Sequence, residues 1–161
     1  MTQIEMDKPR ELRWTFSAIK RFEGAAKVLL RRQGVNNVPQ QTAKSILAMY
    51  GLQADILEVA VGAATGLSWQ EEDDKPSEAA QAIDGYLKQP ENSLESLGRA
   101  VYRAFLEAAD PSGIAIAALE IDEESNLKVK IEKLEKLTTS FKAQLKAPKK
   151  KSKTSGEPAT T

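Results

Sequence analysis

The hydrophobic pattern near the N-terminus changes its period at Ser17. Before this residue, Leu12, Trp14 and Phe16 alternate with polar residues, as in a half-buried strand. After it, apolar residues recur every three or four positions, which predicts a helix over residues 17–32 with Ser17 as its N-cap. The apolar face of this helix consists of Ile19, Phe22, Ala26, Leu29 and Leu30.

The residues before this helix predict a β-hairpin over residues 2–16. A second, shorter alternating apolar pair precedes Asp7 and Pro9, and these two residue types favour a turn. Two strands alone are marginally stable in water, so we expect helices to cover their apolar face. The three apolar residues of the second strand are therefore predicted to pack under the helix at 17–32 and under the last helix of the bundle.

Four further helices are predicted before residue 110, and their approximate ranges are 40–50, 52–65, 76–89 and 93–109. The second of these four is apolar around most of its circumference and is expected at the centre of the bundle. Asn92 and Glu95 have the spacing of a capping box at the start of the last one. The residues predicted to face inward are Ala43, Ile46, Leu47, Tyr50, Leu52, Ile56, Leu57, Val59, Ala60, Ala63, Ala80, Ile83, Leu87, Leu94, Leu97, Val101, Phe105 and Ala108.

The clearest long-range periodicity lies in the C-terminal part of the chain. Residues 112–122 fit either a strand or a short buried helix, and their three alanines favour the helix. Residues 123–146 predict a long amphipathic helix whose narrow apolar seam repeats at alternating steps of four and three, counting Thr138. Such a seam packs on its own bundle, on a partner protein or on a second copy of the chain. The candidate partner-binding residues of the seam are Leu127, Ile131, Leu134, Phe141 and Leu145.

The sequence therefore predicts a mainly α fold: a small helical bundle with an N-terminal β-hairpin, a long C-terminal amphipathic helix and a disordered basic tail. The expected units are residues 1–122, 123–146 and 147–161. The last of these is rich in lysine and has no large apolar residue that would anchor it.

Charge and composition exclude several kinds of chemistry. The net charge is zero, but residues 142–161 hold six lysines and one glutamate, net +5, so residues 1–141 carry −5. The absence of cysteine and histidine excludes disulfides, thiolate nucleophiles, a Ser-His-Asp triad and the common zinc ligand sets. Four consecutive carboxylates at residues 71–74 are expected in a solvated loop, since a cation loop needs alternating ligands. No catalytic, cofactor-binding or metal-binding residue is predicted, and the protein is not expected to be an enzyme.

Nucleic-acid binding is an alternative reading. Lys20, Lys27 and Arg31 form a basic stripe on the helix at 17–32, and the lysine-rich tail adds positive charge. The acidic body and the use of most aromatic residues at core spacing weigh against it, so nucleic acid is not an expected ligand. The longest apolar run, residues 54–67, includes two carboxylates and is too short to cross a bilayer. No leader pattern opens the sequence, and we expect a cytoplasmic protein without a membrane segment.

One stretch resembles a known family. Residues 9–32 contain L-R-W-T-F followed by A-I-K-R-F-E-G, and residues 78–109 contain A-I-D-G-Y-L and S-L-G-R-A-V-Y-R-A-F-L-E-A. This order is similar to that in tail assembly chaperones of long-tailed phages and gene transfer agents.

The resemblance implies a helical protein with a short β element and no catalytic residues. It also implies a function in the host cytoplasm: binding the tape measure protein, keeping it soluble and helping to recruit tail tube subunits. Members of the family are often also made in a longer form by ribosomal frameshifting. Self-association through the C-terminal seam, and a role as a small nucleic-acid-binding or virion structural protein, stay open as alternatives.

Overall fold

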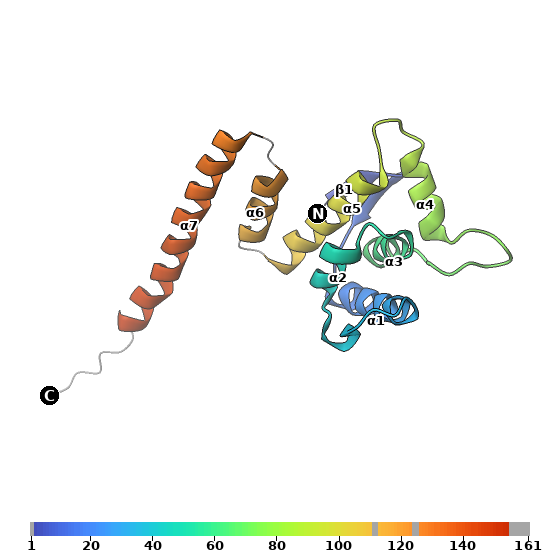
Figure 1. Cartoon of the computed structure of the whole chain (residues 1–161), viewed down its shortest axis with the longest axis horizontal. Coiled ribbons are helices and arrows are strands. Elements are labelled where there is room, and N and C mark those ends of the chain that lie inside the picture. The colour runs from blue at the N-terminus through green and yellow to red at the C-terminus, as the bar shows by residue number, and fades with distance from the viewer. Residues whose placement is uncertain (1, 111–112, 124–125, 155–161) are drawn as a thin grey trace. The chain divides into compact units, whose positions relative to one another are not determined.

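A computed structural model describes residues 2–110, 113–123 and 126–154, although the side chains of residues 114, 115, 123 and 145–154 are outside the description. The fold is mainly helical with an N-terminal two-stranded hairpin, as predicted (Figure 1). The chain divides into a first unit, Met1–Ala109, and a second unit, Asp110–Thr161. The elements are β1 Thr2–Glu5, β2 Pro9–Leu12, α1 Phe16–Arg32, the 3-10 helix η1 Val38–Gln40, α2 Ala43–Tyr50, α3 Ala54–Thr65, α4 Glu78–Leu87, α5 Leu94–Ala109, α6 Ile114–Glu123 and α7 Leu127–Thr154.

The predicted hairpin is present but shorter than expected. β1 pairs antiparallel with β2, with Thr2 opposite Leu12 and Glu5 opposite Pro9. The strand ends at Leu12, and the chain continues past Trp14, which is buried together with Leu12. Both residues therefore occupy the core, as the alternating pattern predicted.

The prediction for Phe16 is wrong, because its side chain is 81% exposed. The N-cap of α1 is Thr15, whose hydroxyl accepts a hydrogen bond from the amide of Ala18 at 3.1 Å, and not Ser17. The helix consequently starts at Phe16, so the period of two stops at Trp14 and Phe16 turns away from the core.

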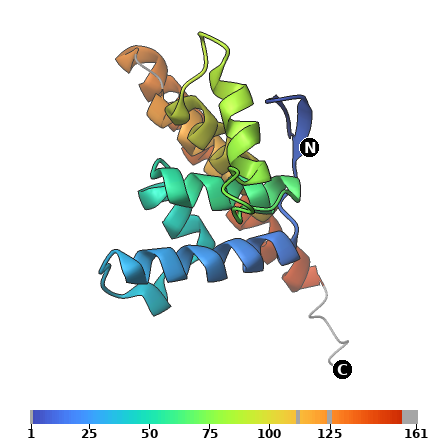
Figure 2. The same ribbon diagram turned by 90° about the vertical axis from the view of Figure 1, so that its right-hand side faces the viewer.

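The apolar helix α3 is the centre of the first unit, as predicted. It packs against α1, α4, β2, α5 and α2, and Figures 1 and 2 show it between α1 on one side and α4 and α5 on the other. A side chain at Gly62 would collide with the ring of Trp69, so the small residue lets the segment after α3 fold back onto it. The buried residues of α3 are Ile56, Leu57, Val59, Ala60, Val61, Gly62, Ala63 and Ala64.

Most of the predicted inward residues are buried or half-buried, and four are exposed instead: Leu52, Leu87, Leu94 and Ala108. Leu52 lies in the turn before α3, which starts only at Ala54. Near the end of α4, Tyr86 is buried, so the neighbouring Leu87 points to another side of the helix.

The start of α5 also differs from the prediction. Ser93 and Ser96 cap the helix reciprocally: the amide of each donates to the hydroxyl of the other, at 2.9 and 3.1 Å. Asn92 instead donates from its side chain to the carbonyl of Tyr86. The reciprocal cap therefore lies one residue later than the predicted capping box. Leu94 is the first residue of the helix and is exposed.

The turn of the hairpin rests on α4 at Gly85. A Cβ at this position would lie 2.5 Å from the backbone nitrogen of Asp7, so only glycine allows the two backbones to approach this closely. Figure 2 shows the hairpin beside α4. Within the turn, the Asp7 carboxylate accepts two hydrogen bonds from the Arg10 guanidinium, at 2.7 and 2.8 Å.

This bidentate pair predicts an acid-sensitive contribution to stability. The hydrogen bonds from Arg10 lower the pKa of Asp7 from 3.8 to about 2. The pair therefore stabilises the folded state fully above about pH 4, and its contribution is lost as the pH falls through about 2. Since the carboxylate side chain is 37% exposed, we expect the pair to contribute less than about 1 kcal/mol.

The check is an NMR titration of the Asp7 carboxyl carbon in the wild-type protein and in Arg10→Gln. The midpoint should be near pH 2 in the first and close to the usual aspartate value in the second. Arg13→Gln, on the same segment, should leave it unchanged. A midpoint near 4 in the wild-type protein would contradict the pairing.

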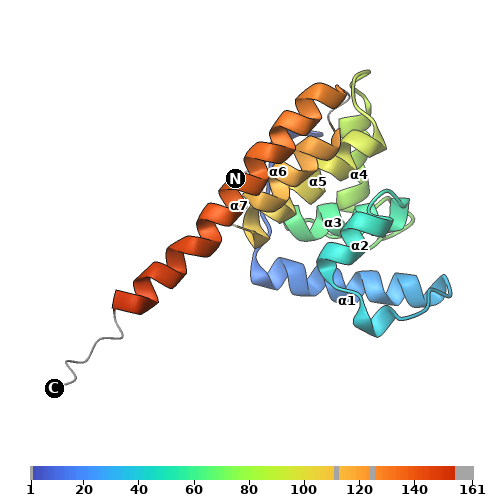
Figure 3. The same ribbon diagram turned by 60° about the vertical axis from the view of Figure 1, so that its left-hand side comes forward.

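The second unit is a pair of helices. The ambiguous segment at 112–122 contains the helix α6, as the alanines indicated, and α6 packs against α7 (Figure 3). Because of this packing, α6 belongs to the second unit, which starts at Asp110. Asn126 begins α7 by accepting the amides of Lys128 and Val129 with its side-chain oxygen.

The long helix α7 starts and ends later than the predicted range of 123–146. It extends to Thr154, through the first part of the segment that was predicted to be disordered. Lysine has a good helix propensity, which is consistent with this extension. The rest of the predicted tail, residues 155–161, lies outside the described residues.

Candidate partner-binding surface

The predicted seam of α7 is exposed along its described length. The exposed fractions are 71% for Leu127, 48% for Ile131, 53% for Leu134 and 45% for Phe141. The side chain of Leu145, the fifth predicted residue, lies outside the described part of the chain. Four large apolar side chains in one row are thus open to solvent. A row of this kind is a candidate protein-binding surface, whereas scattered exposed apolar residues are not.

The side of α7 that is partly buried is not the seam. Among residues 126–144, the half-buried side chains are Val129, Lys130 and Leu137, and α6 is the helix of this unit that packs on α7. Among the described side chains of α6, Ile121 is the buried apolar one. At 100° per residue, Leu137 lies roughly 80° from the centre of the seam, so packing on that side leaves the seam free.

Charged residues flank the seam on both sides. Lys128, Glu135 and Lys142 follow one edge, and Lys130 lies at the other edge. Their charged groups keep an exposed apolar row hydrated, while their aliphatic stems extend the apolar surface. In the free protein the charged groups keep this surface hydrated. In a complex the apolar side chains and stems supply the contact area.

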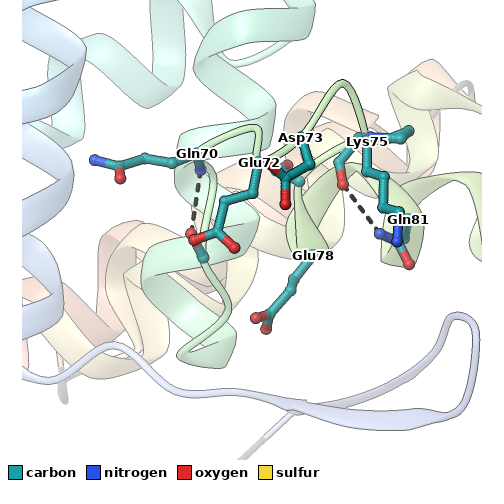
Figure 4. A pocket seen from close by; sticks show the side chains of 9 residues that line it. Gln70, Glu72, Asp73, Lys75, Glu78 and Gln81 are labelled. Carbon is teal, nitrogen blue, oxygen red and sulfur yellow. Dashed lines mark hydrogen bonds between the residues drawn. The ribbon is translucent and has the colours of Figure 1, made fainter.

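The acidic loop at residues 71–74 is exposed to solvent. Glu72 and Asp73 line a hollow with Lys75 and Glu78 (Figure 4). The loop turns through two residues with positive φ, 49° at Asp73 and 58° at Asp74. Within the described residues no three acidic side chains are placed to hold a metal ion. The loop is consistent with the predicted solvated turn.

The basic stripe on α1 is partly engaged within the first unit. The ammonium of Lys27 forms an ion pair with Glu23 at 3.1 Å and lies 3.4 Å from the carbonyl of Pro39. The guanidinium of Arg21 lies over the ring of Trp69, 5.0 Å from its centroid. Lys20 and Arg31 are exposed. Of the three residues of the predicted stripe, Lys27 is thus paired within the unit and the other two are open to solvent.

Three further exposed apolar residues of the first unit were not predicted to be exposed from the sequence. Met49 and Leu52 are exposed at the turn between α2 and α3, and Leu52 lies against Gly98 of α5. Leu94, one helical turn before Gly98, is exposed as well. Gly51 was the available signal, because a glycine at the end of a short helix indicates a turn and so removes Leu52 from the helical face.

Comparison with known protein families, with curated proteins and with solved structures finds no match for this chain. Among the helices in the described part, none has the length and apolar character needed to cross a membrane.

Proposed function

We propose that this protein is a tail assembly chaperone of a long-tailed phage. In this proposal it binds the tape measure protein in the host cytoplasm, keeps it soluble and helps to recruit tail tube subunits. The proposal is supported by the resemblance of residues 9–32 and 78–109 to that family. The single structural observation that carries it is the exposed seam of α7.

A chaperone for a long helical client needs an apolar surface that binds helices without causing its own aggregation. The seam meets both requirements, because helix-in-groove recognition uses apolar anchors at three- and four-residue spacing. Covering its four described side chains contributes about 4 kcal/mol, taking roughly half of the value for full burial, before the cost of ordering the client. The contribution of each side chain to the binding free energy is therefore modest. Weak individual contacts suit a client that must be released when tube subunits assemble around it.

Co-expression with a candidate tape measure protein tests the proposal. The gene neighbourhood provides the candidate: a long, helix-rich open reading frame next to a tail tube gene. We expect the candidate to be insoluble alone and to become soluble, and to co-elute with this protein, when both are expressed. A candidate that stays in the pellet beside a folded, soluble partner would argue against the proposal.

Nucleic acid and particle association are measured in the same preparation. A nucleic-acid-binding protein would retain phosphate-rich material after nuclease-free purification. A virion structural protein would be found in finished particles, whereas a chaperone is absent from them.

A further inference from the structure

The seam of α7 has a regular heptad register. In the usual notation, Ile131, Thr138 and Leu145 occupy the a positions. The d positions hold Leu127, Leu134 and Phe141. Each described large apolar residue of this set is between 45% and 71% exposed, so the register describes a surface that α6, its neighbour within the second unit, leaves uncovered.

The residue types at these positions favour two strands. β-Branched residues at a combined with leucine at d are the combination that selects parallel dimers over trimers and tetramers. Here a is isoleucine, threonine and then leucine, and d begins with two leucines. Thr138, Phe141 and Leu145 fit less well, which makes the association weaker than that of a long leucine zipper.

The flanking charges select the partner and its direction. In a parallel, in-register pair, each g residue faces the e residue five positions later in the other helix. Lys130 at g then faces Glu135 at e of a second copy, and the symmetry of the pair repeats this contact. In the antiparallel arrangement of the same seam, Lys128 would face Lys142 of the second copy and Glu135 would face its own counterpart, and both contacts are repulsive.

We propose that, in the absence of a client, two copies of this protein associate through α7 as a parallel two-stranded coiled coil. The half-buried side of α7, where α6 packs, adjoins this interface at its g edge, where Lys130 and Leu137 are half-buried, and leaves the a and d positions and Glu135 exposed. The proposed dimer does not depend on the proposed function. If the protein is a chaperone, as proposed above, the client and the second copy compete for the same seam. The free protein then protects its own binding surface until a client displaces the second copy.

Charge exchange tests the register and the direction. Sedimentation equilibrium without any client should show a reversible dimer of the wild-type protein. Lys130→Glu and Glu135→Lys should each weaken dimerisation roughly tenfold, because each replaces two attractive contacts by two repulsive ones. An equimolar mixture of the two variants should associate about as well as the wild-type protein, since the contacts between unlike chains are attractive again.

Lys136→Glu is the matched control, because it makes the same change of charge on the outer face of α7. It should leave dimerisation unchanged, and circular dichroism should show equal helix content in all variants. Wild-type protein that stays monomeric at the highest concentrations reached would overturn the proposal. So would a Lys130→Glu variant that dimerises like the wild-type protein, as an antiparallel pair would.

A cross-link gives an independent measure of direction. The natural chain has no cysteine, so a single introduced cysteine reports only on its own position. Leu127→Cys at the first d position should form a disulfide between copies in a parallel pair, since it meets itself there. In an antiparallel pair the two sulfurs would be roughly 27 Å apart. Lys136→Cys should not cross-link, and equal cross-linking of both variants would count as random collision and against the coiled coil.

Discussion

Replacement of Trp14 by alanine should lower the free energy of unfolding of the first unit by about 3–5 kcal/mol, the range for emptying a buried aromatic site. The indole is buried and meets Phe22 and Phe105 edge to face, with ring centroids 5.6 and 5.5 Å apart. Its nitrogen donates a hydrogen bond to the carbonyl of Val101 at 3.2 Å. The residue thus joins the hairpin segment, α1 and α5, and no neighbour can fill the space of an indole.

Urea denaturation, followed through the fluorescence of Trp69, measures this change. Phe16→Ala is the matched control, because it removes an aromatic ring two residues away that is exposed. It should change the unfolding free energy by less than about 0.5 kcal/mol. Trp14→Phe keeps the ring contacts and removes the hydrogen-bond donor. Its unfolding free energy should therefore lie between those of Trp14→Ala and Phe16→Ala. Equal stability of the alanine variants at 14 and 16 would show that the hairpin segment is not part of the core.

The double variant Leu134→Ser, Phe141→Ser should abolish solubilisation of the client while leaving the fold nearly intact. Both side chains are about half exposed, so their loss removes apolar binding surface and leaves no large cavity. Each substitution costs a few tenths of a kcal/mol in helix propensity, roughly. The measurements are the soluble fraction of the co-expressed client and the melting temperature of the variant alone.

Met49→Ser, Leu52→Ser is the control for this variant, because it removes two similarly exposed apolar side chains from the first unit. It should still solubilise the client. Client loss with this pair instead would move the binding surface to the turn before α3. If the variant Leu134→Ser, Phe141→Ser folds and still solubilises the client, the seam of α7 is not the client-binding surface. A fall of several degrees in its melting temperature would indicate that the seam stabilises the fold.

The single variant Lys130→Glu separates client binding from self-association. It keeps every apolar residue of the seam and changes only a flanking charge. If the client is bound through the apolar row, solubilisation should persist in this variant even though dimerisation is weakened.

Periodicity was sufficient to predict the core where helix boundaries were unambiguous. Ile56, Leu97 and Val101 are buried as predicted, because each lies inside a helix whose period fixes its side. Phe16 and Leu94 are exposed, and each is the first residue of its helix. At Phe16 the helical period replaces the strand period and changes the face, whereas Leu94 lies at the end of the apolar face of α5.

The state of the seam could not be deduced from its spacing, since the same steps of four and three serve an intramolecular contact and an open surface equally well. The position of α6 was undetermined for a related reason. An apolar segment of ten residues does not reveal whether its neighbour is the preceding or the following helix.

The hydrogen bond from Trp14 to Val101 also has a consequence for the order of folding. It joins residues 87 positions apart, whereas α6 and α7 are consecutive helices separated by only a few residues. Rates of folding fall as the sequence separation of contacts rises, because distant segments must lose more chain entropy to meet. The α6–α7 pair can therefore form as soon as its own residues have been made. Trp14 and Phe22 can complete their packing only after α5 has been made. During synthesis the aromatic cluster of the first unit stays incomplete until Phe105 has been made.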